Sequence, residues 1–218
     1  MSTRGRWRFP TCRGSDDEEG AMSAIERLPS LRDEPPMDEA RFLKFLEARG
    51  EDERWELIEG EPIQMMHPPS LKHQIIGQNL ERLLNDALEA QASKLFAIRE
   101  IGLAIAHKPT FRPQADVAVI DEEHGDNPYF AERFHLVAEV LSASNTREYI
   151  STKRLHYAEH GDCLYVLILS QTDRAVEVWS RASGWQGRVY RSPDDRIDLP
   201  EFGFSCFLRD LYARTDLA

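Results

Sequence analysis

The chain has 218 residues, of which 41% are hydrophobic and 30% are charged, and its formal net charge is −11. This length allows one domain with a substantial core. The acidic balance argues against a protein that coats nucleic acid with a broad basic surface, but it excludes neither a local basic groove nor carboxylates that hold a metal ion. No apolar run approaches the length of a membrane span, so we expect no membrane association.

The three cysteines lie far apart, at Cys12, Cys163 and Cys206. They have neither the spacing of metal ligands nor that of a disulfide framework, which favours a reducing, cytoplasmic location. The arginines near the N-terminus are not followed by an apolar core, so we expect no secretory signal there.

The first part of the chain has the composition of a disordered extension. Residues 1–37 contain Gly, Pro and Ser together with the acidic run Asp16–Glu19. We therefore predict disorder over residues 1–37 and a single domain over residues 38–218. Met22 offers a second translation start, which leaves open whether residues 1–21 belong to the native protein.

Two helices and a hairpin are predicted in the first half of this domain. Residues 37–50 have an apolar side at helical spacing, and Gly50 would end that helix. Residues 54–66 predict two short strands joined by a tight turn. A long amphipathic helix follows, with Ser70 as its N-terminal cap.

After the long helix the hydrophobic period becomes that of strands. Strands are predicted over residues 95–106, 115–120, 135–141, 163–169 and 174–181. One helix interrupts them, because Asn145 and Glu148 form a capping-box pattern and Gly161 stands where a helix would end. This order indicates an α/β or α+β domain with a mixed central sheet and flanking helices.

A carboxylate interrupts the apolar strand 135–141 at Glu139, and burying such a charge is costly without a partner. Asp116 begins the strand 115–120. If these strands pair antiparallel, the start of one lies beside the end of the other, and the two carboxylates meet. A cation between them would relieve their repulsion, and oxygen ligands favour Mg²⁺ or Mn²⁺ over zinc.

Lys153 is predicted to return to the same level of the sheet. The strand runs about 10 Å from Glu139 to its end near Ser142, at roughly 3.3 Å per residue. The helix from Asn145 to Lys153 spans about 12 Å, at roughly 1.5 Å per residue. If the helix folds back along the sheet, these lengths nearly cancel. A lysine beside a metal-bound water can orient that water and stabilise developing phosphate charge.

Each of these residues also has an ordinary structural explanation. Asp116 could begin a strand or cap a turn, and Lys153 could be a solvated helix residue. Glu139 and Lys153 could form a structural ion pair in an unrelated sheet protein. A metal-dependent phosphohydrolase that acts on RNA or nucleotides is a further alternative.

The segments ELIEGEPIQMM, PPSLKHQIIGQNLERLL, RPQADVAVI and HLVAEVLSASNTREYISTK resemble the Uma-type family of putative restriction endonucleases, part of the PD-(D/E)XK nuclease superfamily. The resemblance extends from about Trp55 to about Trp179. Its strongest part is the EVLS segment, Glu139–Ser142, followed by Lys153, Tyr157 and Gly161 at the family's spacing. It implies a restriction-endonuclease-like αβββαβ core, preceded by the N-terminal helix and hairpin.

The resemblance also implies roles for individual residues. The two active-site acids of the family correspond to Asp116 and Glu139, and a recurrent helix histidine corresponds to His73. In many superfamily members the lysine lies two residues after the second acid, where this chain has Leu141. In this family the lysine is displaced onto the following helix, which maps it onto Lys153.

The carboxylate of the family's hairpin corresponds to Glu56 or Glu59, and Glu59 is the predicted supporting residue. The chain departs from the family pattern at three positions. Ala115 and Ala143 stand where proline is common, and Ser170 stands where aspartate is frequent. None of these changes removes the two acids or the lysine, although they leave room for a degenerate or specialised enzyme.

These observations predict an endonuclease that hydrolyses DNA phosphodiester bonds with Mg²⁺ or Mn²⁺ as its cofactor. Asp116, Glu139 and the backbone carbonyl of Val140 would bind the metal ion, and Lys153 would position the attacking water. The alternative is a catalytically inactive nuclease-fold module that binds nucleic acid.

Four further residues are expected to assist metal binding, catalysis or DNA binding. Glu59 would add a ligand or orient a water, and His73 would hydrogen-bond within the site or contact phosphate. Arg147 and Arg154 would supply local positive charge toward DNA. Because the rest of the chain is acidic, we expect DNA binding to rely on a homodimer or a partner.

Overall fold

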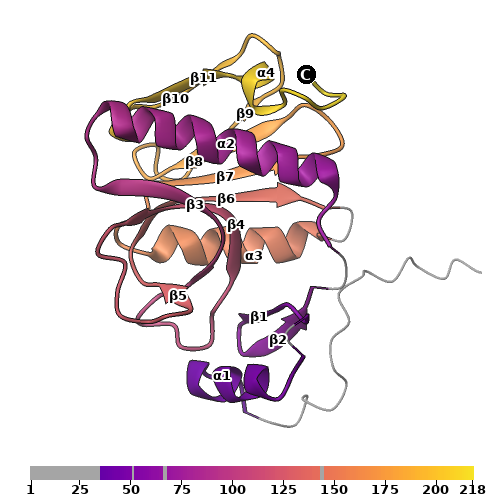
Figure 1. Ribbon diagram of the computed structural model, residues 1–218, viewed down its shortest axis with the longest axis vertical. Coiled ribbons are helices and arrows are strands. Elements are labelled where there is room, and N and C mark those ends of the chain that lie inside the picture. Colours follow the sequence, from indigo (N-terminus) through magenta and orange to yellow (C-terminus); the bar gives the residue numbers. More distant parts are fainter. Residues whose placement is uncertain (1–34, 51, 66–67, 143–144) are drawn as a thin grey trace, which may run out of the picture.

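The computed structural model describes residues 35–50, 52–65, 68–142 and 145–218 (Figure 1). The prediction of disorder for residues 1–34 concerns residues outside these ranges. Ala143, where proline is common in the family, also lies outside them. Met37, at the end of the predicted extension, is buried, and its backbone N–H donates to the carbonyl of Gly60 at 2.9 Å. The packed part of the described chain therefore includes Met37.

Through residue 180 the described elements follow the predicted order, apart from one short additional strand at Phe130–Ala131, and further short strands and a short helix follow. The described elements are α1 (Glu39–Glu47), β1 (Trp55–Ile58), β2 (Glu61–Gln64), α2 (Leu71–Ala90), β3 (Leu95–Leu103), β4 (Gln114–Asp121), β5 (Phe130–Ala131), β6 (Phe134–Leu141), α3 (Arg147–Glu159), β7 (Tyr165–Ser170), β8 (Val176–Ser180), β9 (Gly187–Tyr190), β10 (Arg196–Leu199), β11 (Phe204–Phe207) and α4 (Leu208–Leu211). No helix in these described ranges has the length and apolar character needed to cross a membrane.

A mixed sheet forms the centre of the fold. In the described chain its strand order is β5-β3-β4-β6-β7-β8-β9. β4 pairs antiparallel with β3 and β6, whereas β7 runs parallel to β6 and is reached through the crossover helix α3. The succession α2-β3-β4-β6-α3-β7 is the predicted αβββαβ core, and β5 is a short addition at the sheet edge.

Alternate residues of the strands face two different helices, as the period of two requires. Val119 of β4 packs in the core that contains α2, together with Leu136 of β6. Ala118 and Val137 pack in the core that contains α3. The two long helices therefore cover opposite faces of the sheet (Figure 1).

The N-terminal helix and hairpin form a small unit that packs beside the core, at the lower end of the view in Figure 1. Leu57 of β1 exchanges backbone hydrogen bonds with Arg112 at 3.0 and 2.7 Å. Phe42 of α1 and Phe130 of β5 lie in the same apolar cluster as Leu57. Gly60 has φ +81°, and a Cβ there would lie 2.5 Å from the Cβ of Pro36, so this turn requires glycine.

The two long helices differ in how well their caps are predicted. Ser70 caps α2 as expected, since its hydroxyl accepts from the backbone N–H of His73 at 3.1 Å. The predicted cap of α3 is wrong by one residue, because Thr146 is the N-cap. The side chain of Asn145 instead accepts from the backbone N–H of Ser142 at 2.6 Å and closes the turn after β6.

Candidate active site

The two predicted acids lie where β4 and β6 separate. The register of the antiparallel pair runs to Val117 opposite Ala138, and Asp116 and Glu139 are the next residue of each strand. Beyond this pair, the Oδ2 atom of Asp116 accepts from the backbone N–H of Val140 at 2.7 Å. A side-chain carboxylate thus replaces a backbone acceptor at the strand end, and the predicted antiparallel arrangement is confirmed.

Asp116 is also held by a contact from α2. The Nε2 atom of His73, in the first turn of α2, lies 3.2 Å from Oδ2 of Asp116. Burial lowers the pKa of His73, but the hydrogen bond and charge of Asp116 outweigh this effect, so the pKa is raised overall. The Nδ1 atom of His73 is buried and has no hydrogen-bond partner among the described residues.

Glu139 belongs to the opposite, α3-facing side of the site. Its Oε1 atom accepts from the hydroxyl of Tyr157 at 2.7 Å and lies 2.8 Å from Nζ of Lys153. Burial raises the pKa of Glu139 to about 7; the charge of Lys153 opposes this rise and the charge of Asp116 adds to it. Glu139 is therefore poised to exchange its proton near neutral pH.

Lys153 is almost completely buried, with 2% of its surface exposed. Its ammonium group lies 2.8 Å from Glu139, 2.9 Å from Oε1 of Glu56 and 3.0 Å from the carbonyl oxygen of Gln114. Burial lowers the pKa of Lys153, but the two carboxylates raise it well above its usual range. The predicted return of the helix to the level of Glu139 is confirmed, and all three N–H donors of the ammonium have acceptors.

The hairpin contributes Glu56 to this cluster rather than the predicted Glu59. Glu56 is fully buried in β1, and it accepts from the backbone N–H of Gln114 at 2.7 Å and from the hydroxyl of Tyr149. The Glu59 side chain is 66% exposed and lies 3.4 Å from His156 instead. Glu56 carries the same sequence signal as Glu139, a carboxylate within an apolar strand, whereas Glu59 lies in the turn.

Two tyrosines on α3 complete the cluster. Burial raises the pKa of both Tyr149 and Tyr157, and the neighbouring carboxylates raise it further, so both hydroxyls remain hydrogen-bond donors. Tyr149 donates to Glu56, and Tyr157 donates to Glu139. Tyr157 stands at the family's spacing after the EVLS segment, whereas Tyr149 had no sequence signal, because a tyrosine on an amphipathic helix is typical of ordinary core packing.

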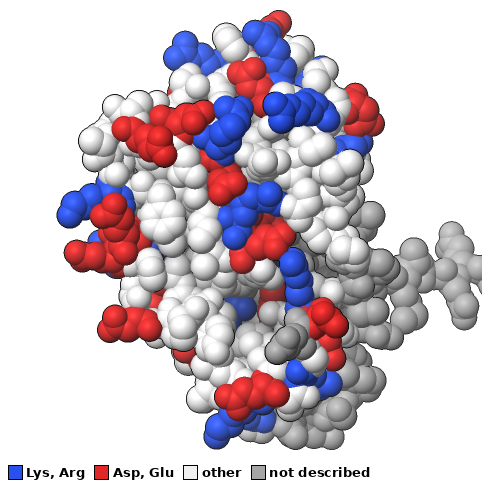
Figure 2. All heavy atoms as spheres, viewed as in Figure 1, with Lys and Arg blue, Asp and Glu red and all other residues white. Residues whose placement is uncertain are grey.

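The two arginines predicted to face DNA lie in different surroundings. Arg147 is exposed in the first turn of α3. The guanidinium of Arg154 stacks 3.9 Å from the ring centroid of Trp179. On the face shown in Figure 2, acidic and basic side chains alternate without a broad basic area.

The ligand chemistry of the two acids fits a hard cation. No three His, Cys, Asp or Glu side chains form a ready-made metal cage within the described residues. Mg²⁺ commonly binds only one or two carboxylates and completes its shell with waters and substrate phosphates. Oδ1 of Asp116 and Oε2 of Glu139 hydrogen-bond to no described residue, which leaves one oxygen of each carboxylate for such an ion.

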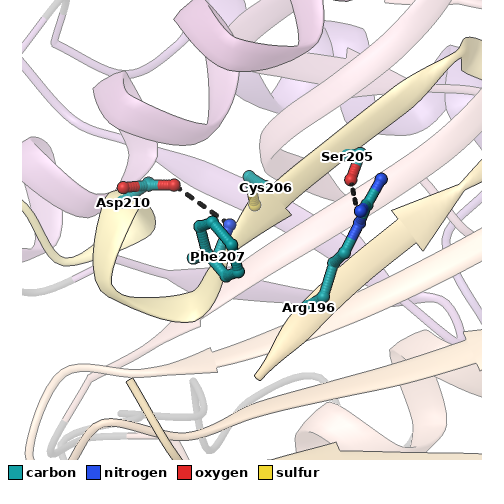
Figure 3. A pocket seen from close by; sticks show the side chains of 5 residues that line it. All are labelled: Arg196, Ser205, Cys206, Phe207 and Asp210. Atoms are coloured by element: carbon teal, nitrogen blue, oxygen red, sulfur yellow. Dashed lines mark hydrogen bonds between the residues drawn. The ribbon is translucent and has the colours of Figure 1, made fainter. Parts of the chain in front are cut away.

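A hollow elsewhere on the molecule offers no comparable chemistry. It has a volume of about 220 Å³ and lies among β10, β11 and α4 (Figure 3). Its polar groups are satisfied locally, since Arg196 donates to Ser205 at 2.7 Å and Asp210 accepts from the backbone N–H of Phe207 at 3.0 Å. Burial raises the pKa of Cys206 to about 12, so its thiol stays protonated.

The αβββαβ core with this cluster at one end of its sheet defines a nuclease fold of the restriction-endonuclease type. The family model of Uma2, described as a putative restriction endonuclease, matches residues 40–209. The chain therefore belongs to the Uma2 family, and the resemblance noted in its sequence is confirmed.

Comparison with known structures supports the fold. The matching chains of known structure include a putative nuclease belonging to DUF820 from Anabaena variabilis ATCC 29413. It has 20% sequence identity and a TM-score of 0.67, and the match covers 82% of this chain and 98% of that one. No curated protein matches the chain.

Proposed function

We propose that this protein is an endonuclease that hydrolyses DNA phosphodiester bonds and requires Mg²⁺ or Mn²⁺. One observation carries the proposal: the buried ammonium of Lys153 is held against Glu139, beside the strand end that presents Asp116. Membership of a restriction endonuclease family and the nuclease fold support it.

In this proposal Asp116, Glu139 and the backbone carbonyl of Val140 hold the divalent ion. When bound, such an ion lowers the pKa of a coordinated water and neutralises charge on the scissile phosphate. His73 fixes the orientation of Asp116 through the contact at Oδ2. Oδ1 of Asp116 is then available to bind the divalent ion.

Lys153 orients the attacking water and offsets the charge that develops on the phosphate. Its three donors are already engaged, so it can reach a substrate oxygen only by releasing one acceptor. Glu139 is the acceptor with a competing role as a ligand. Glu56 and the carbonyl of Gln114 then keep the ammonium in place.

The proposal also covers the extent of the domain, the oligomeric state and the cellular location. The predicted domain of residues 38–218 is extended to Met37, which packs with it, and forms the proposed nuclease domain. DNA binding relies on a homodimer, in which local basic side chains of both copies contact the duplex and offset the acidic balance of each copy. The free Cys163 and Cys206 favour a reducing, cytoplasmic location.

Replacement of Asp116 by Asn tests the metal-dependent reaction. The carboxamide oxygen can still accept from Val140 and His73, so the fold should be retained. We expect cleavage of plasmid DNA in Mg²⁺ or Mn²⁺ to fall by at least about 10²-fold, because a ligand is lost. Thermal unfolding measured with and without Mg²⁺ should show stabilisation of the wild type and little change for this variant.

An Asp116→Asn protein that folds and still cleaves DNA at the wild-type rate would refute the proposed role of Asp116. A wild-type protein that binds DNA but does not cleave it in either metal would instead favour the inactive binding module. Cleavage of RNA or nucleotides in place of DNA would favour the phosphohydrolase.

Replacement of Glu56 by Gln tests whether the hairpin positions the lysine. Gln accepts one hydrogen bond but carries no charge, so Lys153 should be held less firmly. We expect kcat to fall about tenfold to a hundredfold with little change in KM, because Glu56 touches no substrate. Glu59→Gln is the matched control on the same hairpin, and its kcat should equal that of the wild type. Equal kcat values for all three proteins would contradict a positioning role.

A further inference from the structure

Arg99 on β3 has a guanidinium group for which the described residues provide no hydrogen-bonding partner. Its Nε atom is buried, yet it forms no hydrogen bond within the described part of the chain. Buried donors are nearly always paired, because an unpaired one loses its hydration without compensation. Arg99 as a whole is partly exposed, so an acceptor from outside the chain would meet the terminal nitrogens of the guanidinium rather than the enclosed Nε.

The position of Arg99 places it next to the proposed active site. Arg99 lies opposite Val117 of β4, one residue along that strand from Asp116. Its side chain runs beside α2 at Gly77, where a Cβ would lie 3.4 Å from Nε. His73, which contacts Asp116, precedes Gly77 by one helical turn. The guanidinium therefore belongs to the α2-facing side of the site.

Glu100, the acid next to Arg99 in the sequence, already has other partners. Oε1 of Glu100 accepts from Gln74 at 2.9 Å, and Oε2 lies 3.1 Å from Arg54. The hydrogen bond from Gln74 is the main cause of the lowered pKa of Glu100, and the charges of Arg54 and Arg99 contribute to it. Glu100 thus leaves the guanidinium of Arg99 free to bind another anion.

We propose that Arg99 binds a backbone phosphate of the DNA strand held at Asp116 and Glu139. This rests on the proposed function, because it takes DNA as the ligand. The planar guanidinium offers paired donors that match two phosphate oxygens, and a fixed positive charge next to the acids reduces their repulsion of the DNA backbone. In an acidic protein, such a contact gives the strand a defined position on the α2-facing side.

Binding measurements on Arg99→Gln and Arg99→Lys test this proposal. Dissociation constants for a duplex are measured by fluorescence anisotropy in Ca²⁺, with salt varied between about 50 and 200 mM. Arg99→Gln should weaken binding by about tenfold and reduce the slope of log K against log salt by about one. Arg99→Lys should keep the slope but bind more weakly than the wild type, because the charge remains and the paired donors are lost.

Arg82→Gln is the matched control, since it removes a guanidinium on the exposed side of α2 that pairs with Asp86 at 3.0 Å. Its binding and salt slope should equal those of the wild type. If Arg99→Gln behaves like Arg82→Gln while the wild type binds DNA, the role of Arg99 is overturned and the proposed function stands.

The two proposals fail in different ways. Arg99-dependent binding by a protein that does not cleave DNA would retain the phosphate contact and overturn hydrolysis. A wild-type protein that does not bind DNA overturns both. Thermal unfolding of each variant separates loss of binding from loss of fold, and Arg99→Lys, which preserves the charge, still tests the paired contact if Arg99→Gln is unfolded.

Discussion

Replacement of Lys153 by Met is expected to abolish DNA cleavage and to lower the free energy of unfolding by about 3–5 kcal/mol at pH 8. The ammonium is the common partner of Glu56 and Glu139, both of them buried. Without it, two carboxylates remain in a dry environment with no compensating charge. Loss of one group that stabilises developing charge costs about 10²–10³-fold in kcat, which would bring cleavage near the detection limit.

The stability loss in Lys153→Met should depend on pH. The pKa of Glu139 is already raised to about 7 by burial, and removal of the opposing lysine charge raises it further. At lower pH Glu139 takes up a proton, and its unpaired charge disappears. Urea unfolding at pH 5.5 and pH 8 should therefore show the larger loss at pH 8.

Two further variants test whether the effects of Lys153→Met come from the loss of this particular ammonium group. Lys44→Met removes an exposed lysine from α1 and should leave both stability and cleavage unchanged. The triple variant of Lys153→Met, Glu56→Gln and Glu139→Gln should recover much of the lost stability, because no charge is left unpaired, but it should remain inactive. Cleavage by folded Lys153→Met at the wild-type rate would rule out the proposed role of the lysine.

Replacement of Glu139 by Gln is expected to abolish cleavage and to flatten the dependence of stability on pH. Because burial raises the pKa of Glu139 to about 7, its contribution to stability is full below its unfolded pKa and is lost as the pH rises through 7. In the metal-free wild type, raising the pH from about 5 to about 8 should cost on the order of 2–3 kcal/mol from this group. In Glu139→Gln this fall in the free energy of unfolding between pH 5 and pH 8 should be absent.

The measurement is the free energy of urea unfolding across this pH range in the presence of EDTA. Acids with lowered pKa values, such as Asp121, Glu100 and Asp173, stay ionised above pH 5 and do not disturb the comparison. The raised pKa of His73 acts in the same direction above about pH 6.5, so a small slope should remain in the variant. A variant with the full wild-type slope would exclude Glu139 as its source.

The order of elements could be predicted from the sequence because each long segment has one dominant hydrophobic period. The apolar stripe of α2 and the alternating residues of β4 and β6 depend on burial, which local sequence records directly. The sequence predicts the cap of α3 one residue too early, because Asn145 and Thr146 are both good caps. Only the turn after β6 decides between them, by engaging the Asn145 side chain.

The cluster around Lys153 was only partly predictable, for a different physical reason. The position of Lys153 relative to Glu139 follows from the lengths of one strand and one helix. Glu56 is distant in sequence, and its role depends on how the hairpin packs against the sheet through Leu57 and Arg112. Unlike Glu56, which interrupts an apolar strand, Arg99 had no sequence signal, since an arginine in a strand is commonly solvated.

The position of Lys153 depends on the hairpin being packed against the core. Glu56 arrives at Lys153 only if the small N-terminal unit is seated on the core. A chain that has formed its sheet but not seated this unit would hold the lysine with one fewer acid and with the carbonyl of Gln114 less well ordered. In the proposed mechanism, a chain that has not seated the hairpin would therefore hold Lys153 less firmly and cleave DNA less efficiently than the completely folded protein.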